Sequence, residues 1–439
     1  MKVLDLIVGL LILGGNIFAQ NPICPLGTYI ADPTARVWPD GKLYIYGSTD
    51  ESPDYWCSYK HDVLYTSDLK SWTFVPNIFS TKGDYDAVPE TDALLFAPDA
   101  QYRDGRYFLY FCTPSTAYSE GVAVSDTPLG PFRGARKLDT QGYDQIDPTI
   151  FIDDDGQAYY YWGQKNLKAA KMKSNMMELD TASIRDRVLT VEEHFFHEGA
   201  FAFKRAGLYY LVFADESRRG KPTCLGYATS KSPMGPFTYR GVIIDNYGCD
   251  PGNWNNHGSV AEFNRQWYVF YHRSSHGSQV MRRACMEPIY FQEDGSIQEV
   301  EMTSQGAGEP LSATKKIEAV RACLLQGSCR VEKRGTEERL CIRDTGDAAG
   351  YKYIDFADGV SKVVLRGKVR NAGLVRIRLN RFDGPVVGTV PVPVSAAEQE
   401  ITSFSAALTT PIKGKQALYL EFVGEADNWL ELDSFYFEH

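Results

Sequence analysis

The fold is decided by residues 146–161, whose sequence is IDPTIFIDDDGQAYYY. An acidic residue before proline opens this stretch, and a short apolar strand, an Asp-Gly turn and an aromatic strand follow it. Two strands that flank an Asp-Gly turn are typical of a tight β-hairpin. Residues 146–161 therefore predict a hairpin that begins at Asp147.

The same pattern recurs along the chain at a spacing of roughly fifty to sixty residues, a repeat length built here only from short strands. Its five instances lie in residues 32–46, 97–110, 147–161, 198–211 and 257–269. Such repeats predict a β-propeller, in which four-stranded blades surround a central channel, and five instances predict five blades. An irregular series of β-sandwiches is the alternative, but sandwiches do not repeat a motif at blade spacing.

The repeats also predict a shared pocket. The first strand of each blade lines the axis of a propeller, so the residue that leads this strand lies near one mouth of the channel. The leading residues are Asp32, Asp99, Asp147, Glu198 and His257. We therefore expect four acids and a histidine around one opening.

The composition excludes several classes of protein. The 439 residues are enough for two or three domains. Hydrophobic residues make up 44% and charged residues 23%, which predicts a packed core and excludes wholesale disorder. Aromatic residues reach 13%, and with 38 Gly and 22 Pro they favour strands and turns over a helical bundle. The net charge is −10 and no dense Lys/Arg cluster occurs, which argues against a nucleic-acid partner.

The first nineteen residues are typical of a secretory signal peptide. Lys2 supplies a positive start, residues 6–13 are apolar, and the small residue Ala19 precedes the expected cut. A buried N-terminal strand or helix is the alternative. No later segment is long and apolar enough to cross a membrane. We therefore expect an exported protein, whether periplasmic, on the cell surface or secreted.

The mature chain divides into two domains. Residues 20–303 hold the five-bladed β-propeller, and residues 304–316 form a linker that opens with a Gly- and Ser-rich run. Residues 317–439 read as alternating strands of one β-sandwich of the jelly-roll type. The predicted fold class is therefore all-β.

The nine cysteines contain no CxxC pair, which argues against a zinc site. Export permits disulfides, and we expect one or two bridges, with Cys323, Cys329 and Cys341 as candidates for one of them and the pairing left open.

Carboxyl groups that meet in one pocket suggest hydrolysis of a glycosidic bond. That reaction needs one carboxylic acid that donates its proton and one ionised carboxylate that activates water. A third carboxylate nearby raises the pKa of the acid by like-charge repulsion. A single Asp at a strand start is usually a turn cap, so the argument depends on the recurrence of acids at equivalent blade positions.

Five motifs carry a family resemblance. They are Ala31–Asp32–Pro33, Phe96–Ala97–Pro98–Asp99, residues 146–156, Tyr161–Trp162–Gly163 and His197–Glu198–Gly199–Ala200. In this order and spacing they resemble glycoside hydrolase family 43 over residues 25–303. The resemblance implies a five-bladed propeller and an inverting enzyme, in a family of mostly α-L-arabinofuranosidases and β-xylosidases.

The resemblance also implies roles for individual residues. Asp32 matches the general base, Asp147 the residue that modulates the pKa of the acid and orients the site, and Glu198 the general acid. His257 matches a central histidine that lies beside a calcium ion in the channel. From the residues alone, a hydrogen-bonded structural histidine is the alternative. No organic cofactor is implied.

Two departures from the family pattern change the walls of the pocket. Gly199–Ala200 follow Glu198 where the family usually has Ala or Gly and then Pro, and Phe96 stands where Trp is usual. The residues that we expect to contact the substrate are Phe96, Asp99, Trp162 and Arg282. For Arg282, in the last blade, a packing or surface role is the alternative.

The C-terminal domain resembles a family 6 carbohydrate-binding module. The similarity lies in residues 350–356, 376–379, 418–422 and 432–437. Such modules stack sugars on aromatic rings in loops, and the candidates are Tyr351 and Trp429. Core packing of these rings is the alternative, and a brace for the propeller is the alternative role of the domain.

We therefore expect an exported, inverting, exo-acting glycosidase that removes terminal sugars from plant-type polysaccharide or oligosaccharide. An α-L-arabinofuranosidase or a β-xylosidase is the first expectation. The alternatives are a β-D-galactofuranosidase or another exo-galactosidase of the same family, and a non-catalytic carbohydrate-binding propeller. A blind axial pocket suits the removal of one terminal sugar.

Overall fold

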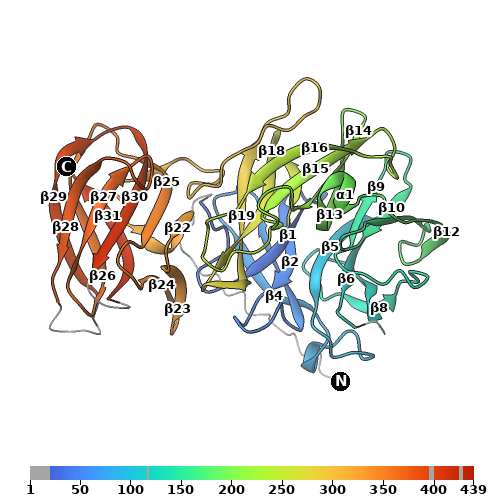
Figure 1. Cartoon of the computed structure of the whole chain (residues 1–439). Coiled ribbons are helices and arrows are strands. Elements are labelled where there is room, and N and C mark those ends of the chain that lie inside the picture. The colour runs from blue at the N-terminus through green and yellow to red at the C-terminus, as the bar shows by residue number, and fades with distance from the viewer. Residues whose placement is uncertain (1–19, 116–117, 395–399, 425–428) are drawn as a thin grey trace.

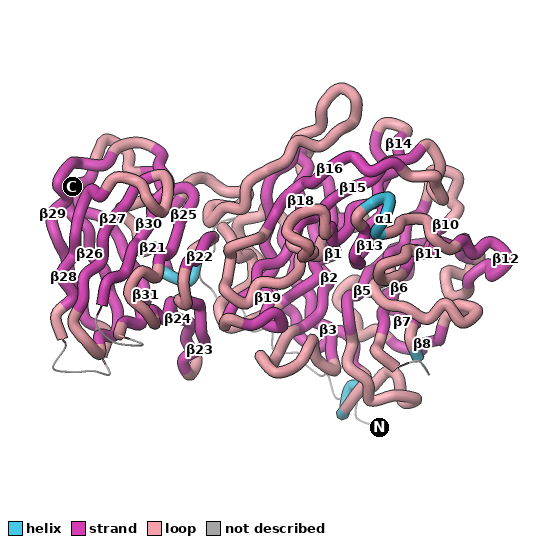
Figure 2. Tube along the Cα trace, viewed as in Figure 1, coloured by secondary structure: helices cyan, strands magenta, loops and turns pink. Residues whose placement is uncertain are grey.

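The structure is a computed structural model that describes residues 20–115, 118–394, 400–424 and 429–439. The regular elements of the described chain are nearly all strands, and they form two bodies that lie side by side, a propeller of five sheets and a curled sheet (Figure 1, Figure 2). The predicted all-β class, with a propeller followed by a sandwich-like domain, is confirmed. The predicted signal peptide, residues 1–19, lies outside the described residues.

The first four blades are antiparallel sheets of four strands that follow one another in chain order. Two short helices, η1 (Gly83–Tyr85) and α1 (Val191–His194), lie in the connections between blades. The strands are β1 (Ile30–Val37), β2 (Leu43–Thr49), β3 (Lys60–Thr66), β4 (Thr73–Ser80), β5 (Phe96–Arg103), β6 (Arg106–Cys112), β7 (Glu120–Ser125), β8 (Arg133–Lys137), β9 (Thr149–Ile152), β10 (Ala158–Trp162), β11 (Lys168–Met172), β12 (Leu179–Arg185), β13 (Phe196–Arg205), β14 (Leu208–Asp215), β15 (Cys224–Ser230) and β16 (Thr238–Asp245).

Aromatic side chains fill the spaces between blades. Strand β2 is buried along its whole length, because both of its faces pack against neighbouring sheets. Between the first and second blades, Tyr46, Phe79 and Phe111 share one core cluster. Phe79 and Phe111 lie with their ring centroids 4.6 Å apart. The high aromatic content of the sequence thus supplies the contacts that hold the ring of blades together.

The fifth blade differs from the predicted four strands. It has three, β17 (Ser259–Phe263), β18 (Gln266–Ser275) and β19 (Ser278–Ile289). The N-terminal segment bonds to the outer strand in place of a fourth one. The Ile23 amide donates to the Ala284 carbonyl at 2.9 Å, and the Asn21 side chain bonds both the amide and the carbonyl of Met286. The start of the described chain therefore closes the ring against its last blade.

The C-terminal domain is one curled sheet whose two halves enclose an apolar core. Its first strand, β20 (Leu311–Ser312), lies inside the predicted linker 304–316 and pairs with β25 (Ala348–Asp355), so the sheet begins before residue 317. Its elements are β20 (Leu311–Ser312), β21 (Ile317–Glu318), η3 (Ala319–Arg321), β22 (Leu324–Gln326), β23 (Arg330–Arg334), β24 (Glu337–Ile342), β25 (Ala348–Asp355), β26 (Val360–Val369), β27 (Gly373–Leu379), β28 (Val386–Val392), β29 (Thr402–Ile412), β30 (Lys415–Gly424) and β31 (Leu430–Glu438).

All nine cysteines are free and buried, so the expected bridges, including any within Cys323, Cys329 and Cys341, are not formed in this structure. Cys323 instead packs with Cys249 and Cys285 in the core between the last blades and the C-terminal domain. Within the described ranges, no helix combines the length and the apolar character needed to span a bilayer.

Candidate active site

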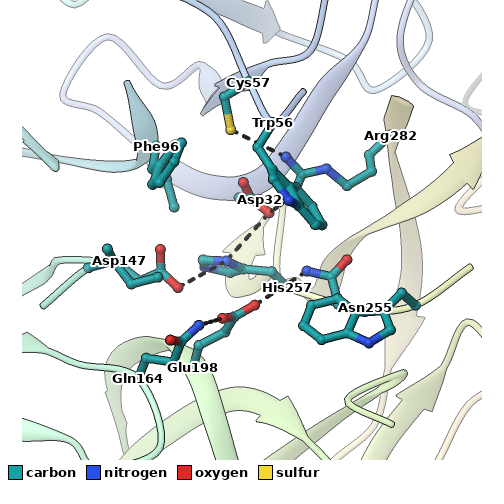
Figure 3. A pocket seen from close by; sticks show the side chains of 13 residues that line it. Asp32, Trp56, Cys57, Phe96, Asp147, Gln164, Glu198, Asn255, His257 and Arg282 are labelled. Atoms are coloured by element: carbon teal, nitrogen blue, oxygen red, sulfur yellow. Dashed lines mark hydrogen bonds and ion pairs between the residues drawn. The ribbon is translucent and has the colours of Figure 1, made fainter. Parts of the chain in front are cut away.

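A pocket of about 200 Å³ opens at one mouth of the propeller channel (Figure 3). Residues from all five blades meet there, including the three acids that the family resemblance assigns to catalysis. The lining residues are Asp32, Trp56, Cys57, Phe96, Ala97, Ile146, Asp147, Gln164, Glu198, Trp254, Asn255, His257 and Arg282.

Irregular backbone aims the acids into this pocket. In β1 the register with β2 slips between Ala31 and Thr34, and Asp32 within this bulge has a φ of 50°. Asp147 has a φ of 61° just before β9. The register of β13 also slips on both sides of Glu198. Non-glycine residues with positive φ are strained and gather at functional sites, and bulges re-aim side chains there.

Asp32 is held as a carboxylate. The guanidinium of Arg282 donates to one of its oxygens at 2.7 Å, and the Ser48 hydroxyl donates to the other at 2.6 Å. Burial raises the pKa of Asp32, but the charge of Arg282 outweighs burial and holds this pKa well below its usual range. An ionised, hydrogen-bonded carboxylate in a pocket is suited to accept a proton from water.

Arg282 is itself fixed by a second carboxylate. Its side chain and its backbone amide make three hydrogen bonds to Asp50, at 2.8 to 2.9 Å. Burial raises the pKa of Asp50 to about 6 in spite of this contact. The ring of Trp56 lies 4.8 Å from the guanidinium carbon. Arg282 thus lines the pocket, and its charge stabilises the Asp32 carboxylate directly. Its contact with the substrate stays a prediction.

Glu198 and Asp147 are two further acids of the pocket. Gln164 donates to one oxygen of Glu198 at 2.7 Å, and Asn255 donates to the other at 3.3 Å. Burial raises the pKa of Asp147 well above its usual range, and the charges of Glu198 and Asp32 raise it further. Asp147 therefore retains its proton at a pH where Asp32 is ionised.

A hydrogen-bonded chain connects the two sides of the site. The backbone amide of Asp32 donates to Nδ1 of His272 at 3.2 Å, so a neutral His272 carries its proton on Nε2. That Nε2 lies 3.2 Å from the Asn255 side-chain oxygen, which leaves the Asn255 amide nitrogen facing Glu198. Burial lowers the pKa of His272, consistent with the neutral ring. The chain fixes Asp32 and Glu198 relative to one another.

His257 lies between the acids. Its Nδ1 is 3.5 Å from Asp32 and 3.9 Å from Asp147, and burial lowers its pKa. Gly199 has a φ of 66°, and a Cβ there would meet the His257 ring at 2.8 Å, which explains a glycine after the acid. Calcium takes six to eight oxygen ligands. Among the described residues no group of three His, Cys, Asp or Glu side chains is arranged to hold a metal ion, and the calcium ion beside His257 stays a prediction.

Asp99 does not line the pocket. In the second blade the residue that corresponds to Asp32, directly before the proline, is Ala97, and Ala97 lies in the pocket wall. Asp99 comes two residues later. It pairs with Arg36 and accepts hydrogen bonds from the Thr149 hydroxyl and the Ile150 amide, both at 2.8 Å. The predicted substrate contact is therefore corrected to an ion pair between inner strands.

Three predicted aromatic contacts are also corrected. Trp162 is fully buried, and its Nε1 donates to the Tyr143 carbonyl at 2.7 Å. Tyr351 and Trp429 are fully buried in the core of the C-terminal domain, where Tyr351 donates to the Ala319 carbonyl. These three rings present no face to a sugar. Phe96, by contrast, lies in the pocket wall as expected.

Several functional residues escaped the sequence argument because they lie on loops and second strands, outside the repeat. Trp56 and Trp254 line the pocket from two such loops, with ring centroids 6.1 Å apart. Asp50 directly follows the second strand of its blade, β2. The sequence signal nearest to these residues is the pair Asn255–Asn256, which directly precedes the repeat position His257.

Replacing Arg282 by Met tests the charge on Asp32. Removal of the guanidinium raises the pKa of Asp32, so the acid limb of the pH profile of kcat/KM is expected to move to higher pH. The loss of a buried charge partner also costs about 3–5 kcal/mol of stability. Arg339→Met is the matched control, because Arg339 is buried beside Glu431 in the other domain. It should lower the Tm without moving the acid limb. An unmoved limb in Arg282→Met contradicts the assignment.

Two family models match the chain. Residues 19–297 match the model described as Glycosyl hydrolases family 43, and residues 325–439 match the model described as Carbohydrate binding module (family 6). A xylosidase/arabinosidase from Thermoclostridium stercorarium is 31% identical over 475 aligned positions, which cover 92% of this chain and 96% of that protein. An arabinoxylan arabinofuranohydrolase from Paenibacillus polymyxa is 26% identical and covers 93% of this chain and 72% of its own.

A solved structure is similar in fold over nearly the whole chain. It is a family 43 arabinoxylan arabinofuranohydrolase from Bacillus subtilis in complex with cellotetraose. The TM-score is 0.55 at 24% identity, and the match covers 96% of this chain and 99% of that chain. At this identity the likeness concerns the fold.

Proposed function

Because the chain belongs to glycosyl hydrolases family 43, we propose that this enzyme removes single α-L-arabinofuranosyl or β-xylosyl units from plant-type polysaccharides and oligosaccharides. It is an inverting glycoside hydrolase. The names of its relatives, a xylosidase/arabinosidase and an arabinoxylan arabinofuranohydrolase, support these two sugars. We further propose that it acts outside the cytoplasm after removal of residues 1–19.

The proposed reaction uses two carboxyl groups in opposite protonation states. Asp32 takes a proton from a water molecule while the water oxygen bonds to the anomeric carbon. Glu198 gives its proton to the glycosidic oxygen, whose bond to that carbon breaks, and the leaving group departs as an alcohol. Asp32 ends protonated and Glu198 ionised, and exchange with solvent restores both. Attack on the face opposite the leaving group inverts the anomeric centre.

The roles of base and acid are assigned from one observation, that different charged and hydrogen-bonding groups surround the three acids. Asp32 bonds the guanidinium of Arg282. The donors to Glu198 are the uncharged amides of Gln164 and Asn255, and the Asp147 carboxyl lies 3.9 Å from His257. A cation beside one carboxyl and like charge beside the others separates the base from the acid. Asp147, beside Glu198 and Asp32, is then the group that keeps a proton within reach of Glu198.

The removal of single units is supported by a floor beneath the pocket. Arg36 of β1 bonds Asp99 of β5 and the Ile150 carbonyl of β9, and its guanidinium lies 4.5 Å from the ring of Phe201 in β13. These contacts tie the inner strands of four blades across the channel. A pocket closed in this way suits a terminal sugar better than the middle of a chain.

A panel of aryl glycosides tests the proposed function. The 4-nitrophenyl α-L-arabinofuranoside, β-D-xyloside and β-D-galactofuranoside are compared by release of nitrophenol. We expect the first or second to be the best substrate. Best release from the galactofuranoside favours the galactofuranosidase alternative. No release from any of them, together with sugar binding measured by calorimetry, favours the non-catalytic propeller and contradicts the proposal.

A further inference from the structure

We propose that the C-terminal domain is a working part of the active site, and that its Glu338 is a positioning residue for Asp32 and Arg282. The proposal rests on the proposed function. It differs from the role of an independent sugar-binding module, because it assigns the domain to the geometry of catalysis. Three contacts between the two bodies carry it.

The first contact holds the tip of the hairpin that carries Arg282. Strands β18 and β19 turn at residues 275–278, next to the cross-strand pair Ser274 and Arg282. Strand β23 of the C-terminal domain bonds this tip on both sides. The His276 amide donates to the Val331 carbonyl at 2.8 Å, and the Lys333 amide donates to Nε2 of His276 at 3.0 Å. The hairpin that places Arg282 is therefore anchored by the other domain.

The second contact passes through Tyr29. Its hydroxyl donates to Glu338 at 2.5 Å, and its ring meets the ring of His276 edge-on with centroids 5.4 Å apart. Its carbonyl accepts the amide of Asp50 at 3.1 Å. Asp32 follows three residues later in the chain. Tyr29 thus connects Glu338 with the carboxylate that holds Arg282 and with the strand that bears the base.

The third contact is a buried ion pair of moderate length. Arg283 follows Arg282 on β19, and its Nη1 lies 3.8 Å from Glu338. Its Nη2 also donates to the Val320 carbonyl at 3.4 Å. Arg283 and Glu338 are both buried. A buried charge loses much stability when its partner is removed, so Glu338 acts at once on the hairpin, on Tyr29 and on Arg283.

The C-terminal domain also bonds a loop that lines the pocket. The Leu325 amide of β22 donates to the Gly248 carbonyl at 2.7 Å. Gly248 belongs to the loop that supplies Trp254 and Asn255 to the pocket. Loss of these contacts between the two bodies is therefore expected to disturb this loop as well as the hairpin that carries Arg282.

The test compares Glu338→Ala and Tyr29→Phe with Glu431→Ala. Glu431 is also buried and ion-paired, with Arg334, Arg339 and Arg370, but all three of these partners belong to its own domain. Tyr29→Phe keeps the ring contact and removes the hydroxyl, so it remains informative if Glu338→Ala does not fold. Kinetics on the best aryl glycoside are combined with hydrogen exchange of residues 275–282.

We expect Glu338→Ala to lower kcat about tenfold with a smaller change in KM. It should also move the acid limb of the pH profile of kcat/KM to higher pH and speed amide hydrogen exchange at residues 275–282. Tyr29→Phe should change each quantity in the same direction by a smaller factor. Glu431→Ala should lower the Tm alone. Folded Glu338→Ala and Tyr29→Phe proteins with wild-type kcat, pH profile and exchange would overturn the proposal. The exchange readout needs no substrate, so a failure of the proposed function is recognised separately, by an inactive wild type.

Discussion

Glu198→Gln is expected to lower kcat/KM for xylo- and arabino-oligosaccharides by on the order of 10²–10⁴, the usual contribution of a general acid. In an oligosaccharide the leaving group is the alkoxide of another sugar, which is a poor leaving group and needs the proton that Glu198 supplies. Dinitrophenolate leaves without help, so dinitrophenyl glycosides should retain most of their wild-type rate. The measurement is kcat/KM for a series of aryl glycosides plotted against the pKa of the leaving group.

The slope of that plot carries the result. It should steepen in Glu198→Gln relative to the wild type. Gln164→Ala is a useful companion, because it removes the 2.7 Å donor to Glu198 and leaves the carboxyl in place. Its slope should stay near that of the wild type. An equal loss on good and poor leaving groups in Glu198→Gln would show that Glu198 is not the acid.

Asp32→Asn should lower kcat/KM on every substrate by about 10³ or more, whatever the leaving group, because no group then accepts the proton of the attacking water. Azide, a nucleophile that needs no base, should restore part of the rate with aryl glycosides and yield a glycosyl azide. Rates with and without azide, and the identity of the product, are the measurements.

Asp62→Asn is the matched control for this substitution. Asp62 is a buried aspartate of the same blade, bonded to Lys60 and outside the pocket. It should cost stability and leave kcat/KM within a few-fold of the wild type. If Asp32→Asn keeps activity at the level of Asp62→Asn, Asp32 is not the base.

The sequence allowed the fold and the core of the site to be predicted because both depend on a local repeat. Each instance places a residue before Pro or Gly at the start of an inner strand, and this position enters the channel in every blade. The same rule explains the error at Asp99. In that blade the position before the proline is Ala97, and the acid two residues on faces Arg36.

Other parts of the site depend on contacts that no local pattern encodes. Asp50 and Arg282 are 232 residues apart, and Tyr29 and Glu338 are 309 residues apart. Burial of Trp162, Tyr351 and Trp429 follows from the packing of whole sheets, since an aromatic ring has the same periodicity in a core as on a binding face. Only the assembled structure distinguishes these cases.

The central claim is that Asp32 and Glu198 act as base and acid from opposite sides of one sugar. Proton NMR of the first-formed product tests it most directly, with an aryl β-D-xyloside or α-L-arabinofuranoside added to the wild-type enzyme and spectra recorded before mutarotation. The inverting mechanism predicts that the initial product is the inverted anomer, α-xylose or β-arabinofuranose. Initial release of the retained anomer would contradict it.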